Sequence, residues 1–194
     1  MHTLRLVNKA YGLGADYKPP HLMQDSFSKV WLCREVFKAV RAANRQLCHL
    51  GMEQLVIISG YRTYTYQAKL FERKIAYYRT QGFDEIAAKE QAAQIVAKPG
   101  HSEHQLGLAV DLTTWSMKDL EDPLITDFAQ TETGKWLLVN SFRFGLILRY
   151  PEDKVAMTHI TYEPWHYRYV GKGPAYAMHE KGLCLEEYLG VTNG

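Results

Sequence analysis

The first long apolar pattern predicts a helix with one buried face, because its apolar residues recur every three or four positions. The residues of this face are Val36, Val40, Ala43, Leu47 and Leu50. Asp25 and Ser26 follow a proline-containing arm, YKPPHL, and are the candidate N-caps. We therefore expect a helical segment early in the chain.

The next patterns predict one strand and two more helices. LVIIS (residues 55–59) is a short β-branched run that ends at Gly60, as expected of a buried strand. TYTYQAKLFERKIAYYRTQG predicts a helix capped by Thr63 and ending near Gly82. Asp84 is the expected cap of a third helix, which runs to about Lys98 and stops at the following PG pair. The apolar face of the second helix consists of Leu70, Phe71, Ile75 and Tyr78.

The second half of the chain is richer in strand patterns. GLAVDL, GLILRY and HYRYV predict strands, GKWLLVNSF predicts a short helix, and a last helix is expected after Pro174. Early helices and late strands with short connections predict an α+β fold with a central, mainly antiparallel sheet flanked by helices. The 194 residues, 46% of them hydrophobic, suit one small domain over residues 1–194.

Charge and composition limit the classes of binding partner and the cellular location that we expect. The chain has 23 basic and 21 acidic residues without a long like-charged run, so neither a nucleic-acid tract nor an anionic-membrane anchor is indicated. No stretch approaches the roughly 20 apolar residues of a membrane span, and the N-terminus lacks the apolar region of a signal peptide. Cys33, Cys48 and Cys184 are too scattered for a disulfide framework and are expected to be small core residues. We expect a cytoplasmic protein, or an extracytoplasmic one of the cell envelope if a leader has been removed.

One residue breaks the apolar pattern of the predicted strands. Asp111 lies in PGHSEHQLGLAVDL, where an apolar side chain would be expected, and His104 precedes it. Because a buried, unpaired carboxylate costs several kcal/mol, Asp111 needs a hydrogen-bonding network, a cationic partner or a metal ion. Histidine nitrogen and aspartate oxygen are good zinc ligands, but two ligands do not make a site. A hydrogen-bonded structural pair is the competing interpretation.

A third ligand candidate lies in YEPWHYRYVG (residues 162–171). His166 enters an aromatic strand there, and Glu163 precedes it across Pro164, which interrupts simple strand pairing. Catalytic zinc commonly keeps three protein ligands and an open position for water, with a carboxylate nearby to take the proton of that water. His104, Asp111, His166 and Glu163 fit these four roles. The residues alone leave open a surface carboxylate and a histidine of an aromatic cluster.

Together these segments resemble the VanY-like zinc D-alanyl-D-alanine carboxypeptidases. SEHQLGLAVD matches the S-x-H-x-x-G-x-A-x-D signature of that family and EPWH matches its E-x-x-H signature. SGYRTYTYQ, LRLVNKAY and LRYPED extend the similarity over nearly the whole chain, and the N-terminus is similar to the cytoplasmic VanXY type, which combines dipeptidase and carboxypeptidase activities. The resemblance implies a small α+β fold, shared with hedgehog-type zinc domains, whose central antiparallel sheet carries the metal.

The resemblance also implies roles for individual residues. His104, Asp111 and His166 become the ligands of one zinc ion, and Glu163 becomes the catalytic base. Arg62, from GYR, corresponds to an arginine that engages the substrate. A guanidinium can clamp a terminal carboxylate with two hydrogen bonds or stabilise a developing oxyanion.

Five further residues lie in or beside the matched segments. Gln67 and Ser102 stand where neutral hydrogen-bond partners for a peptide would be useful. Trp165 is expected either to form a wall of the pocket or to belong to the core. His101 and His159 match no ligand position and are left out of the site.

The activity implied by the resemblance is hydrolysis of the terminal D-Ala-D-Ala bond of a peptidoglycan stem peptide or of the dipeptide, with release of D-alanine. Such an enzyme serves glycopeptide resistance or ordinary wall recycling. An L,D-carboxypeptidase that trims tetrapeptide stems shares these signatures. A phage-type peptidoglycan endopeptidase and a non-catalytic zinc-containing binding module are further alternatives, although Glu163 argues against the last because a structural zinc site needs no base.

Overall fold

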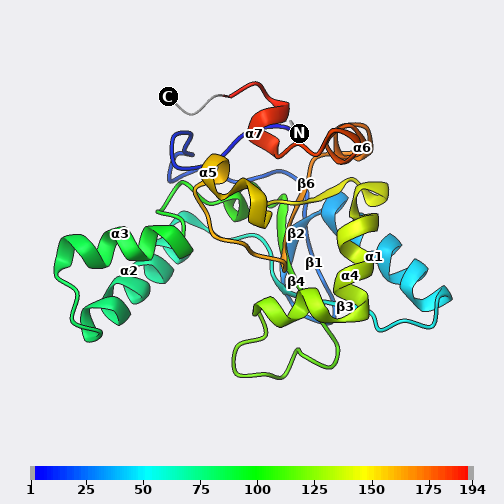
Figure 1. Ribbon diagram of the computed structural model, residues 1–194, viewed down its shortest axis with the longest axis horizontal. Coiled ribbons are helices and arrows are strands. Elements are labelled where there is room, and N and C mark those ends of the chain that lie inside the picture. Colours follow the sequence, from blue (N-terminus) through cyan, green and yellow to red (C-terminus); the bar gives the residue numbers. More distant parts are fainter. Residues whose placement is uncertain (1–2, 192–194) are drawn as a thin grey trace.

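A four-stranded antiparallel sheet lies at the centre of the computed structural model, which describes residues 3–191 (Figure 1). The strands are arranged in the order β3 (Leu55–Ser59), β4 (Ala109–Thr114), β6 (His166–Tyr169) and β5 (Leu146–Leu148). The predicted α+β class with a mainly antiparallel sheet is confirmed. The ends of the predicted 1–194 domain, residues 1–2 and 192–194, lie outside the described residues.

A separate two-stranded sheet, which the sequence did not predict, precedes the first helix. It consists of β1 (Leu22–Gln24) and β2 (Trp31–Cys33). The carboxylate of Asp25 accepts the backbone N–H groups of Phe27 and Ser28, at 3.2 and 2.7 Å, in the turn between these strands. The prediction that Asp25 or Ser26 caps the helix was therefore wrong, because Asp25 stabilises this turn instead.

Helix α1 (Arg34–His49) begins directly after β2 and packs one apolar face against the core. Four of the predicted face residues are buried, whereas Leu50 lies at the C-terminal end of the helix and is half exposed. Cys33 is buried and precedes the helix, and Cys184 is also buried. Cys48 is exposed, so the prediction of a core cysteine was wrong there because its position falls on the solvent side of α1.

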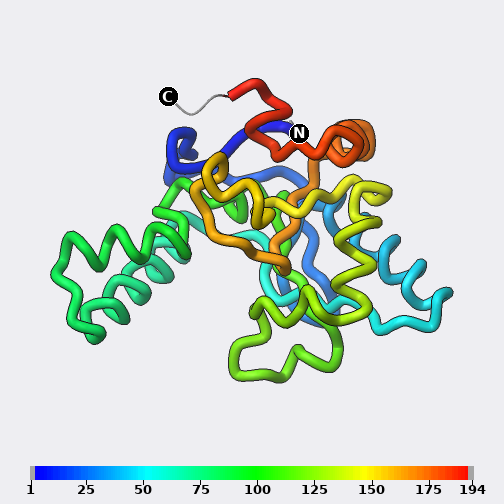
Figure 2. Tube along the Cα trace, viewed as in Figure 1, coloured from blue at the N-terminus to red at the C-terminus, as the bar shows by residue number. Residues whose placement is uncertain are grey.

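Helices α2 (Tyr64–Thr80) and α3 (Glu85–Ile95) form a hairpin that projects from one side of the molecule, green in Figures 1 and 2. Both predicted caps are confirmed. Thr63 accepts the N–H of Tyr66 at 3.1 Å, and Asp84 accepts that of Ala87 at 2.8 Å. The third helix ends earlier than predicted, at Ile95. A small apolar cluster joins the two helices through Phe71, Ile75, Ala88 and Ala92.

The remaining helices cover the other sides of the sheet. Helix α4 (Glu132–Asn140) packs against β4, and the loop between them extends from the lower side of the body in Figure 2. The later helices are α5 (Val155–Thr158), α6 (Lys172–Lys181) and α7 (Leu185–Tyr188). Helix α6 begins before Pro174, which occupies its first turn, where a missing N–H is tolerated. Among the described residues, no helix is long and apolar enough to cross a bilayer.

Strand β4 carries the residue that broke the apolar pattern. All six of its residues are buried, and Val110 and Leu112 belong to the main apolar core. Since successive side chains of a strand point to opposite faces, Asp111 points away from that core. The fold therefore places the carboxylate on the other face of the central sheet, beside β6.

Candidate metal centre

Three ligand candidates converge from two neighbouring strands and a short 3₁₀ helix. Asp111 of β4 lies directly opposite His166 of β6 in the antiparallel register. Opposite residues of adjacent strands share a face of the sheet, so these two side chains meet. His104 comes from the 3₁₀ helix η1 (Glu103–Leu106) that precedes β4. One potential ligand atom from each of the three side chains lies within 4.8 Å of the other two, and all three residues are buried.

Gly107 brings His104 and Asp111 together. It ends η1 with a φ of +68°, a left-handed conformation that glycine adopts without strain. A Cβ at this position would also lie 2.8 Å from the sulfur of Cys33. The turn at Gly107 leads directly into β4, and Nε2 of His104 then lies 3.2 Å from Oδ2 of Asp111.

The ring of His104 is held by the backbone at Gly60. Nδ1 lies 2.6 Å from the carbonyl oxygen of Gly60, so the proton belongs on Nδ1 and Nε2 is left to bind a cation. Residue 60 itself packs so closely against β2 that it has no room for a side chain. A Cβ there would lie 2.5 Å from the carbonyl oxygen of Trp31.

His166 completes the set of donor atoms. Its Nδ1 lies 2.9 Å from Oδ1 of Asp111. The two imidazole rings pack edge to face, with their centroids 4.9 Å apart. Two imidazole nitrogens and one carboxylate oxygen, all turned toward one point, suit zinc, and three protein ligands are typical of catalytic zinc sites. The residues present therefore fit the metal that the sequence analysis expects.

Glu163 lies beside this group, just before β6. Its Oε2 is 3.7 Å from Nδ1 of His166, and only 12% of its side chain is exposed. Its backbone carbonyl accepts the N–H of His166 at 3.1 Å, across the turn that contains Pro164. Burial raises the pKa of Glu163 to about 7. The side chain can therefore accept and release a proton near neutral pH, as a catalytic base requires.

The three ligand candidates differ in their affinity for protons, considering the protein side chains alone. Burial and the charge of Arg62 lower the pKa of His104 to about 4. Burial alone would lower the pKa of His166, but its hydrogen bond to Asp111 and the nearby Glu103 raise it to about 9. Burial alone would raise the pKa of Asp111, yet His104 and Arg62 hold it well below its usual range. Asp111 is therefore anionic.

Arg62 reaches the same group from the end of β3. Its Nη2 donates to Oδ2 of Asp111 at 2.6 Å, and its Nε donates to Oγ of Ser59 at 2.9 Å. Ser59 lies opposite Asp111 in the β3–β4 register, which explains why Arg62, three residues later, lies close to Asp111. The sequence predicted Arg62 as a substrate contact. The structure also gives it a direct contact with a ligand candidate, which was not predicted.

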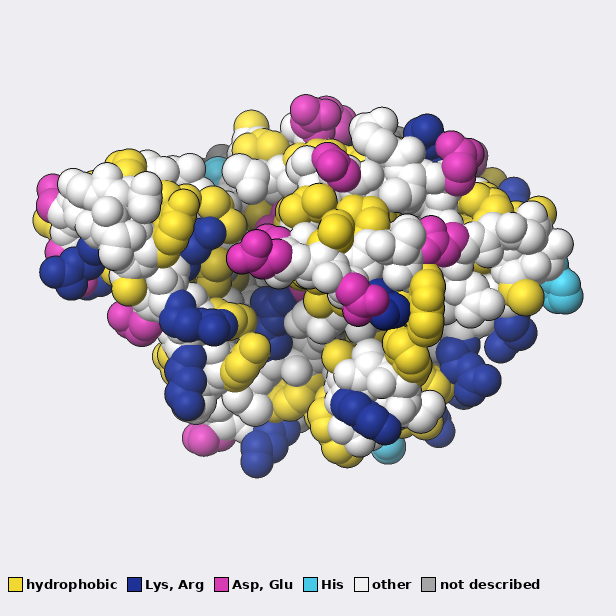
Figure 3. All heavy atoms as spheres, turned by 90° about the horizontal axis from the view of Figure 1, so that it is seen from below, with side chains coloured by type: hydrophobic (Ala, Val, Ile, Leu, Met, Phe, Trp, Pro, Cys, Tyr) yellow, Lys and Arg dark blue, Asp and Glu magenta, His cyan; other side chains and the backbone are white. Residues whose placement is uncertain are grey.

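A cleft of about 810 Å³ opens above these residues. Figure 3 shows the hollow between the projecting hairpin and the body, with Lys and Arg side chains along it. Gln67, Ser102 and Trp165 line the cleft, as do Glu163 and the three ligand candidates. Trp165 also packs against the main core, so it belongs to both predicted environments.

Among these lining residues, Gln67 has a buried acceptor that points to ligand binding. It is almost completely buried, and its amide nitrogen donates to the carbonyl of Ala97 at 2.8 Å. Its Oε1 is buried without a hydrogen-bond partner among the described residues. A buried acceptor without a partner carries an energetic cost that a donor on a bound ligand would remove.

The two histidines left out of the predicted site lie elsewhere. His101 is bound through Nδ1 to the carbonyl oxygen of Asn8 at 2.7 Å, and His159 ends α5 with a φ of +57°. Neither belongs to the group of ligand candidates or lines the cleft.

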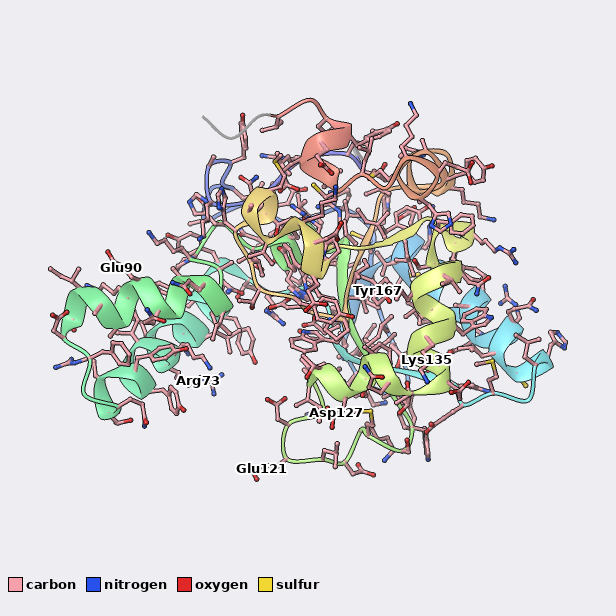
Figure 4. All side chains as sticks on the ribbon, in the orientation of Figure 1. Arg73, Glu90, Glu121, Asp127, Lys135 and Tyr167 are labelled. Atoms are coloured by element: carbon pink, nitrogen blue, oxygen red, sulfur yellow. The ribbon has the colours of Figure 1, made fainter. Side chains whose placement is uncertain are left out.

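Three neighbours of the centre were missed by the sequence analysis. The ring of Tyr150 lies 4.8 Å from that of His166. Arg73 lines the cleft and extends from α2 on the side that faces the body (Figure 4). Glu103 is buried beside His166. The only sequence signal for Glu103 was its place immediately before His104, which is too common a neighbour relationship to single it out.

Known proteins are similar to this chain in sequence. The family model described as VanY: D-alanyl-D-alanine carboxypeptidase matches residues 29–172. A D-alanyl-D-alanine carboxypeptidase of Enterococcus faecalis is 45% identical over 69% of this chain, but the match spans only 47% of that protein. The bifunctional D-Ala-D-Ala dipeptidase and carboxypeptidase VanXYC of Enterococcus gallinarum is 36% identical over 97% of this chain and 94% of its own length.

Solved structures extend the similarity to the whole fold. VanYB in complex with D-alanine-D-alanine has a TM-score of 0.84 and 37% identity, and covers 98% of this chain and 99% of its own. A mutant of the D,D-pentapeptidase VanY from the VanB-type resistance cassette, in complex with Zn(II), has a TM-score of 0.83 and 37% identity over 97% of this chain and 99% of its own. The LD-carboxypeptidase LdcB has a TM-score of 0.83 and 34% identity over 98% of this chain and 87% of its own. The chain belongs to the VanY family of D-alanyl-D-alanine carboxypeptidases.

Proposed function

We propose that this protein is a zinc-dependent D,D-carboxypeptidase that hydrolyses the terminal D-Ala-D-Ala bond of peptidoglycan precursors and releases D-alanine. The observation that carries the proposal is the buried group of His104, Asp111 and His166 with Glu163 at the edge of the same cleft. Family membership and the similarity to VanYB, whose structure contains D-alanine-D-alanine, support the substrate class.

The metal follows from the donor atoms and from the relatives. His104 through Nε2, Asp111 through its carboxylate and His166 through Nδ1 would hold one zinc ion. The Zn(II) complex of the related VanY mutant supports this choice. When bound, zinc supplies Lewis-acid chemistry, which polarises the scissile carbonyl and makes water a stronger acid.

The protein residues supply the proton transfers. The Glu163 carboxylate takes a proton from the attacking water as the new carbon–oxygen bond forms. It then delivers that proton to the amide nitrogen as the carbon–nitrogen bond breaks, so that D-alanine leaves as an amine. Its pKa of about 7 allows both transfers near neutral pH.

Arg62 and Gln67 are the proposed peptide-binding residues. Arg62 lines the cleft, and its Nη2 binds Asp111 while its Nε binds Ser59. Its Nη1 can therefore bind the terminal carboxylate or the developing oxyanion. Oε1 of Gln67 can accept an N–H of the peptide. Ser102 and Trp165 line the same cleft and complete the proposed contacts.

Substrate choice is tested by incubating the zinc-loaded protein separately with D-Ala-D-Ala, a pentapeptide stem and a tetrapeptide stem. We expect D-alanine to be released fastest from the pentapeptide and to stop when a chelator is added. Release from the dipeptide would add a dipeptidase activity, for which the similarity to VanXYC is the supporting observation. Glu163→Gln protein, prepared in the same way, is the inactive control.

A second candidate function is L,D-carboxypeptidase activity on tetrapeptide stems. The similarity to LdcB over nearly the whole chain favours keeping it. Release of D-alanine from the tetrapeptide alone would replace the D,D assignment with this one. No release from any substrate by metal-loaded protein would instead favour a non-catalytic zinc-binding module.

Metal analysis of protein that has not been treated with chelator tests the cofactor directly. We expect about one zinc ion per chain, as a single three-ligand site requires. Finding no stoichiometric metal and no activation by added zinc would contradict the proposed reaction. The cytoplasmic location expected from the sequence is a separate prediction, which cell fractionation with an antibody against this protein would test.

A further inference from the structure

A network of buried charges lies behind His166. It consists of two carboxylates and two guanidiniums, none of which is more than 1% exposed: Glu103, Glu186, Arg149 and Arg168. Oε1 of Glu103 accepts Nε of Arg149 at 2.8 Å and Nη1 of Arg168 at 2.7 Å. Arg149 also donates to both oxygens of Glu186, at 2.9 and 2.6 Å. The charges are balanced, two against two.

Both ends of the described chain close over this network. Glu186 belongs to α7, near the C-terminus. Nη2 of Arg168 donates to the backbone carbonyls of Thr3 and Arg5, at 2.9 and 2.8 Å. In Figure 1 the N-terminal segment and α7 lie at the same end of the molecule. Water is therefore excluded from these ion pairs, and their hydrogen bonds are strong and directional.

Stability alone is a poor reason for such a network. Removing charges from water is expensive, and well-packed apolar residues often replace buried ion pairs without loss of stability. A network of this kind is better explained when one of its members contacts a functional group. Arg168 lies two residues after His166 in β6, so both side chains are on one face of the sheet.

Two atoms next to the network are left without partners. Oε2 of Glu103 and Nε2 of His166 are each buried and form no hydrogen bond with the described residues. They lie 3.7 Å apart, slightly beyond hydrogen-bonding distance. Because both arginines bind Oε1, the other oxygen of Glu103 remains directed toward the imidazole.

We propose that Glu103 is a positioning residue for the metal site, whose Oε2 accepts the Nε2–H of His166 and so keeps Nδ1 turned toward the cation. Arg149 and Arg168 hold Glu103 in this place. Carboxylates that bind the second nitrogen of a ligand histidine are known to fix its tautomer and to raise metal affinity. The inference rests on the proposed metal site and is independent of the proposed substrate.

The variant Glu103→Gln tests the role with little change of shape. The two arginines require an acceptor, so the amide oxygen of Gln would face them and its NH₂ would face Nε2 of His166. When Nδ1 binds a metal, Nε2 of His166 carries a proton. This N–H and the NH₂ group of Gln would then face each other as two donors without an acceptor. We expect the affinity for zinc ions alone to fall roughly 10- to 100-fold, the loss typical of such outer partners, as measured by competition with a chelating dye.

Glu186→Gln is the matched control, because it removes a charge from the same network without changing the group that faces His166. We expect this variant to lose thermal stability as Glu103→Gln does, while its zinc affinity stays close to that of the wild type. An unchanged zinc affinity in Glu103→Gln, or an equal loss in both variants, would overturn the proposal.

A measurement on the wild-type protein remains available if Glu103→Gln does not fold. With histidine labelled by ¹⁵N, NMR of the zinc-loaded protein reports which ring nitrogen carries a proton. We expect His166 to be protonated at Nε2, with a proton that exchanges slowly with water. A proton that exchanges as fast as that of an exposed histidine would also overturn the proposal, whether or not turnover with any peptide is observed.

Discussion

Asp111 shows how one carboxylate is accommodated in an apolar strand. Its neighbours Val110 and Leu112 face the main core, while its own side chain faces two histidines and an arginine. Oδ1 contacts His166, and Oδ2 contacts His104 and Arg62. The cost of burying the charge is offset by these partners, so the residue is tolerated only where all of them converge.

The clearest test at the residue scale is Glu163→Gln. The substitution preserves shape but removes the proton acceptor, so turnover should fall by roughly 10²- to 10⁴-fold. Zinc content should stay near that of the wild type, because Glu163 is outside the group of ligand candidates. Steady-state kinetics and elemental analysis of the same samples measure both quantities.

His104→Ala is the contrasting variant, since it removes a ligand and should lose the metal itself. Unchanged turnover in metal-loaded Glu163→Gln protein would exclude Glu163 as the base.

Metal binding should depend on pH through His166. In metal-free protein its pKa is raised to about 9, so at pH 7 the ring carries a proton that zinc must displace from Nδ1. Zinc affinity should therefore rise by about tenfold per pH unit between pH 7 and 9 and level off above that range. His104, with a pKa of about 4, is already neutral and adds nothing in this range.

Calorimetry in buffers of different ionisation enthalpy measures the protons released by zinc binding. About one proton or more should appear at pH 7. An affinity that stays constant between pH 7 and 9, without proton release, would show that Nδ1 of His166 is not the ligand atom.

At the scale of elements, strand registers and two glycine positions determine where the ligand candidates lie. The registers of β3, β4 and β6 place Ser59, Asp111 and His166 side by side. Gly107 sets the angle at which η1 meets β4, and Gly60 lets β3 approach β2. These contacts depend on backbone geometry, and a single added Cβ at either glycine would disturb them.

Gly107→Ala should destabilise the protein. A non-glycine residue at φ +68° is strained, and the new Cβ would press on the sulfur of Cys33 at 2.8 Å. We expect the free energy of unfolding to fall by about 2 kcal/mol, as strained backbone positions usually cost. Urea denaturation of the metal-free protein measures this change without a contribution from zinc.

Gly14→Ala is the matched control. Gly14 lies in the N-terminal segment, its φ is not positive, and a Cβ there would meet nothing within 4 Å apart from its chain neighbours. Its replacement should leave stability unchanged or raise it by up to about 1 kcal/mol. Equal losses in the two variants would refute the special role of the turn at Gly107.

For the whole molecule, the metal site joins segments that are far apart in the sequence. The ligand candidates come from η1, β4 and β6, and the cleft above them is closed on one side by the α2–α3 hairpin. A cation bound to all three segments can stabilise only the folded arrangement. Stability should therefore be linked to metal binding.

Zinc should raise the melting temperature of the metal-free protein. At a free zinc concentration of about 100 times Kd, the expected gain is about 2.7 kcal/mol in the free energy of unfolding. Differential scanning calorimetry of chelator-treated protein, with and without added zinc, measures the shift. His104→Ala should show none, and an equal shift in that variant would place the bound zinc elsewhere.

The sequence by itself determined most of the elements and the identities of the ligand candidates. Periodicity located α1 to α4 and the four strands of the main sheet, because those patterns are long enough to read. The signatures around His104 and Glu163 identified the chemistry, because few residue types combine metal binding with proton transfer. The hairpin of β1 and β2 escaped prediction because LMQ and WLC contain no β-branched residue and no clear alternation, whereas β5, which is equally short, lies within the apolar run GLILRY.

Only the tertiary structure decided which side chains surround that site. The contact of Arg62 with Asp111, the place of Tyr150 beside His166 and the network around Glu103 join residues that are distant in sequence. The local sequence of Glu103 does not distinguish it from a surface glutamate. It does not show that Arg168 of β6 and Arg149, just after β5, neutralise the carboxylate. Periodicity reports which face of an element is apolar, whereas electrostatic partners are fixed by strand register and chain closure, and these exist only in the folded molecule.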